Sequence, residues 1–239
     1  MPGKIKLSRF LVALLLASAT AVTAQQQLPC APFRDGRVDP KLVAIMLSAA
    51  EHGHLYRVDP AHSRIGFCVD SHFMHIEGYF REFQGGMALH PDEEAAEQMM
   101  VLVYTDSLAT SPAFVENMLK GESFFNTPRH PDILFFSTDF HWDTPTRARI
   151  TGQLTLHGVT RPVDFSVALA TPREVVAAGS ERVRLDAFTT IRRSDFGMDA
   201  LRLIVDDTVQ LCLSIEAAPY RQPEHMPDTG ADTGPGLNE

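Results

Sequence analysis

Histidine is the residue type in this chain with the clearest capacity for metal chemistry, since ten histidines occur along 239 residues. His52 and His54 are two residues apart, and His72 and His75 are three apart in a predicted loop. Neither pair is joined by a third ligand at a familiar spacing such as HExxH. Surface or loop histidines are the simpler interpretation, so we expect no metal site and no cofactor.

A hydrolase would need a nucleophile beside a base. His62 precedes Ser63 and Ser194 precedes Asp195, but neither serine lies in a strand-to-helix turn, and the sequence has no GxSxG motif. Glycine-rich phosphate loops, CxxC pairs and CxxCH haem-attachment motifs are also missing from the sequence. Catalysis therefore has no support, and a secreted hydrolase is the weakest alternative that we consider.

Two adjacent arginines, Arg192 and Arg193, offer polar recognition in the segment TTIRRSDFGMD. Their guanidinium groups could fix a loop by binding carboxylates or main-chain carbonyl oxygens. They could instead contact the headgroup of a lipid, such as a phosphate. We favour the structural role and keep both arginines as candidates for headgroup contact.

These side chains must be positioned by strands, and the segment LTLHGVTRPVDFSVAL shows the pattern most clearly. Apolar residues alternate with polar ones on both sides of a joint at residues 157–162, which contains a glycine and a proline. The alternating set is Leu154, Leu156, Val163, Phe165, Val167 and Leu169. This pattern predicts a hairpin with one face hidden from water.

Alternation with a period of two continues over most of the chain from Leu55 onward. Two segments break it with helical patterns: residues 39–53, which begin with Asp39 and Pro40, and residues 111–121. Many strands and few helices predict an all-β fold, an antiparallel barrel or sandwich. Closure into a barrel would remove the exposed edges of so long a sheet.

The first residues predict export. Lys4, Lys6 and Arg9 precede a short apolar run, and the small residues around Ala24 fit a signal-peptidase cut. We therefore expect a signal peptide at 1–24, a helical extension at 25–54 and a periplasmic protein without a membrane anchor. Residues 219–239, rich in Pro, Gly, Asp and Thr, predict a disordered acidic tail.

The charge balance excludes some partners. Loss of the three positive charges of the signal peptide moves the formal net charge from −9 to −12. A chain this acidic, without a basic cluster, is not expected to bind nucleic acid or to dock on anionic headgroups.

Three cysteines, Cys30, Cys68 and Cys212, occur in a chain expected in an oxidising compartment. Cys68 and Cys212 each have the opposite phase to their apolar neighbours, so they would share one side of a sheet. A bridge between these two, leaving Cys30 free, is one hypothesis; the sequence does not choose the pair.

Five segments now point to a family. They are YRVDPAHSRIGFCV from Tyr56, EGYFREFQGG from Glu77, GESFFNTPRHPDILFFST from Gly121, GQLTLHGVTRPVDFSV from Gly152 and TTIRRSDFGMD from Thr189. In this order they resemble the YceI-like family over residues 55–218, and the combination of LTLHGVTRPV with RSDFGM is quite specific. The segment VDSHFMHIEG, residues 69–78, departs from the commonest version and leaves the identity of the ligand open.

The resemblance implies an eight-stranded antiparallel lipocalin-like barrel, with a short amino-terminal helix and one or two helical insertions, that binds a polyisoprenoid or fatty-acid-like lipid for sequestration or transport. Eight strands leave an interior wide enough for side chains or one small ligand. The residues expected to line the tunnel are Phe67, Phe80, Phe83, Phe124, Phe136, Leu154, Phe165, Phe188, Phe196 and Met198.

The rival interpretation is a non-catalytic interaction module with a filled core. In that case the helix at 39–53 or the acidic surface would engage a membrane-enzyme partner. Phenylalanine, at 15 residues against 4 tyrosines and 1 tryptophan, favours the lipid interpretation, because a dry wall must offer no stray polar group. The sequence leaves homodimerisation open.

Overall fold

The computed structural model describes residues 54–90, 97–178 and 182–220. The predicted signal peptide, the amino-terminal helix and residues 221–239 of the predicted tail lie outside these ranges. None of the helices in the described part has the length and apolar composition that crossing a bilayer would require.

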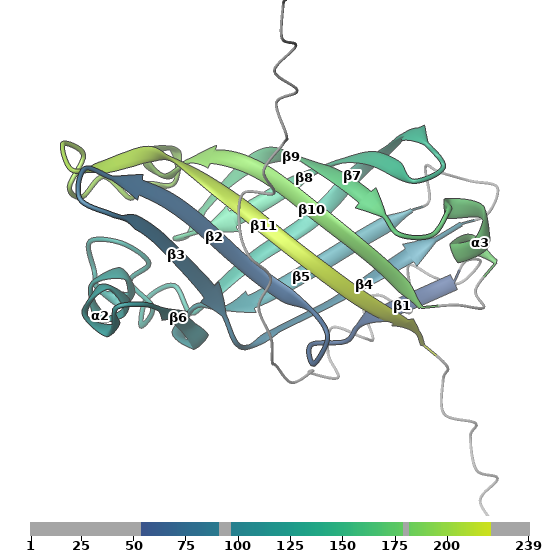
Figure 1. Cartoon of the computed structure of the whole chain (residues 1–239), viewed down its shortest axis with the longest axis horizontal. Helices are drawn as coiled ribbons and strands as arrows, with labels where there is room; N and C mark the ends of the chain where they lie inside the picture. The colour runs from purple at the N-terminus through teal and green to yellow at the C-terminus, as the bar shows by residue number, and fades with distance from the viewer. Residues whose placement is uncertain (1–53, 91–96, 179–181, 221–239) are drawn as a thin grey trace, which may run out of the picture.

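Strands make up most of the described chain (Figure 1). They are β1 (His54–Val58), β2 (Arg64–Ser71), β3 (His75–Phe80), β4 (Phe83–Leu89), β5 (Gln98–Tyr104), β6 (Leu108–Thr110), β7 (Asp132–Thr144), β8 (Arg147–Leu156), β9 (Val159–Leu169), β10 (Val183–Arg192) and β11 (Val205–Pro219). The helices are α2 (Ala113–Lys120) and α3 (Arg173–Ala177), with 3₁₀ turns η2 (Thr105–Ser107) and η3 (Arg193–Phe196). Helix α2 falls within the helix predicted at 111–121.

Hydrogen bonding closes the sheet into an eight-stranded antiparallel barrel, as expected. The ring runs β1–β4–β5–β7–β8–β9–β10–β11 and returns to β1. The long strand β11 pairs with β1 near its end and with β2 along its first ten residues, and β3 and β6 continue outward from β2. Three strands of the ring are therefore extended past short interruptions: β1 by β2, β4 by β3 and β5 by β6. The period-two pattern did not show these breaks, because a strand can bend without changing the side on which its apolar residues lie.

The hairpin of β8 and β9 turns more tightly than expected. Its loop is His157–Gly158, with φ of 53° and 74°, and Leu156 already pairs with Val159. A two-residue turn with positive φ at both positions matches the right-handed twist of the flanking strands. The predicted joint at 157–162 is thus too long, and Pro162 lies within β9 at a position where β10 does not pair with that strand.

Helix α3 covers one end of the barrel (Figure 1), and buried side chains such as Tyr56 fill the interior beneath it. Val176 of α3 is fully buried, and its carbonyl oxygen accepts a hydrogen bond from the Tyr56 hydroxyl. The Arg173 guanidinium contacts the buried Glu97 carboxylate at 3.0 Å and stacks over Trp142, whose indole N–H donates to the same carboxylate at 2.8 Å. These contacts hold α3 across the barrel end.

The opposite end is built differently, because β6 pairs with β3 and gives way to α2 instead of pairing with β7. Helix α2 and the following segment 121–131 fill the wall at this point. Val115 and Leu119 of α2, with Phe124 and Phe125 after it, are buried in the core. Irregular backbone therefore replaces the sheet along this side of the barrel.

The cysteines correct one hypothesis. Cys68 is disulfide-bonded to a partner outside the described residues and Cys212 is a free thiol, so the proposed Cys68–Cys212 bridge is wrong. The two lie on one side of paired strands, but Cys68 is opposite Gln210 and Cys212 is opposite Gly66. Diagonal neighbours are about 7–8 Å apart, beyond the usual Cα separation of a disulfide. Burial raises the pKa of the Cys212 thiol to about 11.

Candidate ligand cavity

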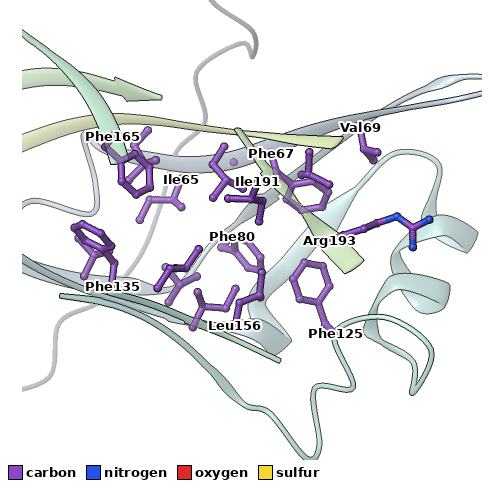
Figure 2. Close-up of a pocket in the computed structure, with 18 of the residues that line it drawn as sticks. Ile65, Phe67, Val69, Phe80, Phe125, Phe135, Leu156, Phe165, Ile191 and Arg193 are labelled. Carbon is purple, nitrogen blue, oxygen red and sulfur yellow. The ribbon is translucent and has the colours of Figure 1, made fainter. Parts of the chain in front are cut away.

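A cavity occupies the barrel interior between α2 and the buried residues beneath α3. Its walls come from inward-facing positions of nearly every strand, together with α2 and the segment after it. The lining residues are Ile65, Gly66, Phe67, Val69, Ile76, Phe80, Met99, Val101, Val103, Met118, Leu119, Phe124, Phe125, Ile133, Phe135, Ile150, Leu154, Leu156, Phe165, Val167, Leu185, Ala187, Ile191, Arg193, Met198, Val205, Val209, Leu211 and Leu213. Arg193 alone among them carries a charged side chain, and its guanidinium points away from the cavity (Figure 2), so the lining is almost wholly apolar.

Aromatic rings define the two ends of the cavity. Figure 2 shows Phe135 and Phe165 at one end and Phe125 near Arg193 at the other. The Phe135 and Phe165 rings meet edge to face with centroids 5.0 Å apart. At the Arg193 end, the Phe125 ring lies 5.8 Å from those of both Phe67 and Phe80. Such tilted and edge-to-face contacts are favourable for aromatic side chains and hold the walls in place.

Two glycines make room for these rings. A Cβ atom at Gly78 of β3 would lie 2.3 Å from the Phe67 ring, and one at Gly152 of β8 would lie 2.5 Å from the Phe135 ring. Each ring therefore lies across a glycine of the neighbouring strand. The glycines are a requirement of the aromatic walls, since any larger residue would push the rings into the cavity.

The cavity volume is about 130 Å³, which is below the roughly 300–1,000 Å³ of typical sites for drug-sized ligands. A ligand that fits this space is thin. Three methionines, Met99, Met118 and Met198, belong to the walls, and methionine is unbranched and adapts to irregular shapes. The walls can thus widen along a flexible chain more readily than around a rigid ring system.

Arg193 lies at one end of the cavity and is only 3% exposed. Its guanidinium donates to the main-chain carbonyl oxygens of Met198 at 2.6 Å, Ala200 at 2.7 Å, Val205 at 2.9 Å and Asp206 at 2.9 Å. Burial lowers the pKa of Arg193. None of its contacts in the described residues is a carboxylate, and they occupy four of its five N–H donors. The favoured structural role is present, and the nearby carboxylates of Asp199 and Asp207 partly offset the effect of burial on the guanidinium.

Arg192 points to the opposite side of the strand. It is exposed and forms an ion pair with Asp195 at 2.9 Å. Because consecutive residues of a strand face opposite sides, one arginine of the pair reaches the interior and the other reaches solvent. Arg192 therefore does not line the cavity, and its prediction as a headgroup contact at the cavity end is wrong.

The structure brings six of the ten predicted lining residues together around the cavity. They are Phe67, Phe80, Phe124, Leu154, Phe165 and Met198. Phe83 and Phe196 are buried in the core without lining the cavity. Whether the lining residues bind a ligand stays a prediction.

Phe136 and Phe188 are corrections, because both face away from the interior. Phe188 is 38% exposed on the outer wall, since its neighbour Ala187 holds the inward phase of β10. Phe136 belongs to a small outer cluster with Leu55, Ala88 and Met100. Its neighbour Phe135 is the inward residue, and the bulge between Ser137 and Asp139 hides this phase in the sequence.

Sequence reasoning also missed Phe125 and most of the aliphatic wall. Phe124 and Phe125 are adjacent and both line the cavity, which strand alternation does not permit. They lie after α2, where the chain is irregular. The adjacent phenylalanines in GESFFNTP and in ILFFST were the available signal. Which phenylalanine of each pair faces the cavity could be read only from the structure.

Solved structures share this fold. The chain is similar to BcnA from Burkholderia cenocepacia, with a TM-score of 0.61 and 21% identity, covering 67% of this chain and 99% of that chain. It is also similar to a polyisoprenoid binding domain from Saccharophagus degradans, with a TM-score of 0.53 and 13% identity, covering 69% and 98%. At these identities the likeness shows the fold alone.

Sequence relatives extend the comparison. A UPF0312 protein of Pseudomonas putida is 30% identical over 141 residues, covering 59% of this chain and 72% of the relative. A UPF0312 protein of Enterobacter sp. is 29% identical over 164 residues, covering 67% and 84%. The family model of the YceI-like domain matches residues 56–217, which span nearly the whole closed barrel. The chain therefore belongs to the YceI-like family.

Proposed function

We propose that this protein binds a single long apolar chain, such as a polyisoprenoid, inside the barrel and carries or sequesters it without chemical change. The observation that carries the proposal is the dry cavity inside a closed barrel, with one buried cation at its end. Support also comes from the similar Saccharophagus degradans domain, which is described as polyisoprenoid binding. The predicted signal peptide makes the periplasm the proposed location.

A chain-like ligand suits the walls better than other apolar molecules. Burial of each CH₂ group contributes about 0.8 kcal/mol without directional bonds, so affinity can come from length alone. The filled core beneath α3 limits how far the chain reaches, because Tyr56 and Val176 are fully buried there. The ligand then lies with one end against Phe135 and Phe165 and the other toward Arg193.

We further propose that the end of the ligand near Arg193 carries oxygen, as an alcohol, carboxylate or phosphate does. One guanidinium N–H remains for it after the four carbonyl contacts. A charge-assisted hydrogen bond of this kind is about twice as strong as a neutral one.

Titration of lipid-free protein with prenyl compounds tests the proposal. We expect each added isoprene unit to strengthen binding by about tenfold or more until the cavity is filled. At equal chain length, a prenyl phosphate or alcohol should bind more tightly than the hydrocarbon. Isothermal titration calorimetry measures both series. Affinity that does not change with chain length, or a preference for a rigid sterol, would contradict a chain-binding cavity.

A further inference from the structure

Exposed apolar side chains gather on two loops at the Arg193 end of the barrel. One loop joins β2 to β3 and the other joins η3 to β11 (Figure 1). The exposed residues are Phe73 and Met74 on the first loop and Leu201, Leu203 and Ile204 on the second. Phe73 is 81% and Leu203 is 87% exposed. The two loops are joined by a hydrogen bond from the His72 N–H to the Ile204 carbonyl oxygen at 2.9 Å. We call these five residues the apolar rim.

Local hydrogen bonds fix the shape of both loops. The Ser71 hydroxyl accepts from the Met74 N–H at 3.1 Å and donates to the Met74 carbonyl oxygen at 2.7 Å. Leu201 has a φ of 54°, and its carbonyl oxygen accepts from the N–H groups of Ile204 and Val205. The left-handed region favours glycine or asparagine. The chain therefore holds apolar side chains outward on tight turns, although burial would be more favourable for each.

The rim is continuous with the cavity. Val69 precedes the first loop, while Met198 and Val205 flank the second, and all three line the cavity. Arg193 binds the carbonyl oxygens of Met198, Ala200 and Val205 and thus ties the second loop to the cavity end. At the other end, α3 and the Arg173–Glu97 contact cover the core. An apolar chain that enters or leaves the cavity therefore has its shortest apolar path past the rim.

Two cationic side chains beside the rim have carboxylates close to them. Arg202 is paired with Asp199, and His75 lies 2.6 Å from Asp70. The rim thus has no excess of cations that would require an anionic surface, and the net charge of −9 disfavours one. These features fit a neutral lipid surface, into which exposed aromatic and leucine side chains insert.

We propose that the apolar rim docks on a lipid bilayer, with Phe73 and Leu203 inserted, so that the apolar ligand passes directly between the bilayer and the cavity. The proposal rests on the proposed function, because it assigns the bilayer as source or destination of the bound chain. The rim includes part of the segment at 69–78 in which this sequence departs from the commonest family version.

Flotation with phosphatidylcholine vesicles tests the docking. The wild-type protein, cleared of lipid, is expected to float with the vesicles, with little change between low and high salt. The double substitution Phe73→Ser and Leu203→Ser should reduce the partition coefficient at least tenfold. The matched control, Phe188→Ser with Val175→Ser, removes exposed apolar side chains from the outer wall and from α3. It should float like the wild type.

Binding of farnesol in solution separates the two proposals. The rim double variant should keep the wild-type affinity for farnesol, because neither substituted residue lines the cavity. Failure of the wild type to bind farnesol, with rim-dependent flotation retained, would count against the proposed function alone. Absence of flotation, equal loss in the control variant, or a rim-dependent dimer that does not bind vesicles would overturn the docking.

Discussion

Replacement of Arg193 by methionine is expected to lower the free energy of unfolding by about 3–4 kcal/mol, because four carbonyl oxygens lose their donor at once. Methionine keeps much of the apolar stem, so the loss reports the hydrogen bonds more than the packing. The loop at 197–204 should loosen with them. Urea unfolding of lipid-free protein, followed by circular dichroism, measures the change.

The neighbouring arginine provides the control for this substitution. Arg192 is exposed, and within the described residues it forms one ion pair, with Asp195. Exposed ion pairs contribute little to stability, so Arg192→Met should change the free energy of unfolding far less than Arg193→Met does. Similar effects of the two substitutions would mean that Arg193 does not hold the loop.

Replacement of Ala187 by phenylalanine is expected to weaken binding of a prenyl alcohol at least tenfold, since the new ring occupies much of a cavity of about 130 Å³. Ala187 lies on β10 between Val167 and Leu213, which also line the cavity. Because the ring enters open space, the free energy of unfolding should fall by less than about 1 kcal/mol. The same ring in a filled core would lower it by about 1–3 kcal/mol. Calorimetric titration and urea unfolding give the two values.

An outward alanine controls for the added ring. Ala168 on β9 is exposed and faces away from the cavity. Ala168→Phe should leave binding within about twofold of the wild type, because it places the ring on the outer wall. A strong loss of stability in Ala187→Phe with no effect on binding would indicate that the α2 half of the barrel is as filled as the α3 half.

The strand pattern predicted the barrel because apolar alternation is a direct consequence of having one buried face. It placed Phe165 and Leu154 correctly on the inward face of the hairpin. The prediction failed at Phe188 because it favoured a phenylalanine over the alternation of the strand. Leu185 and Ala187 already marked the inward positions of β10. At Phe136 the phase itself was ambiguous, since two phenylalanines are adjacent and a bulge follows.

Other features depend on contacts between distant segments. The closed end of the interior follows from α3 packing against Tyr56, and the wall of the cavity at the other end depends on α2 replacing sheet. Neither consequence is visible in local periodicity. The role of Arg193 required the positions of four carbonyl oxygens on another segment. The alternation of β10 could have separated the outward Arg192 from the inward Arg193, but it could not show what the guanidinium of Arg193 contacts.

The most direct measurement of the central claim is mass spectrometry of an organic extract of the protein, purified without added lipid from the cells that produce it. We expect one class of long-chain, oxygen-ended lipid at close to one molecule per protein, reduced several-fold in Ala187→Phe and unchanged in Ala168→Phe. An extract without lipid, together with no binding of prenyl compounds by the wild type, would contradict the claim that the barrel holds an apolar chain.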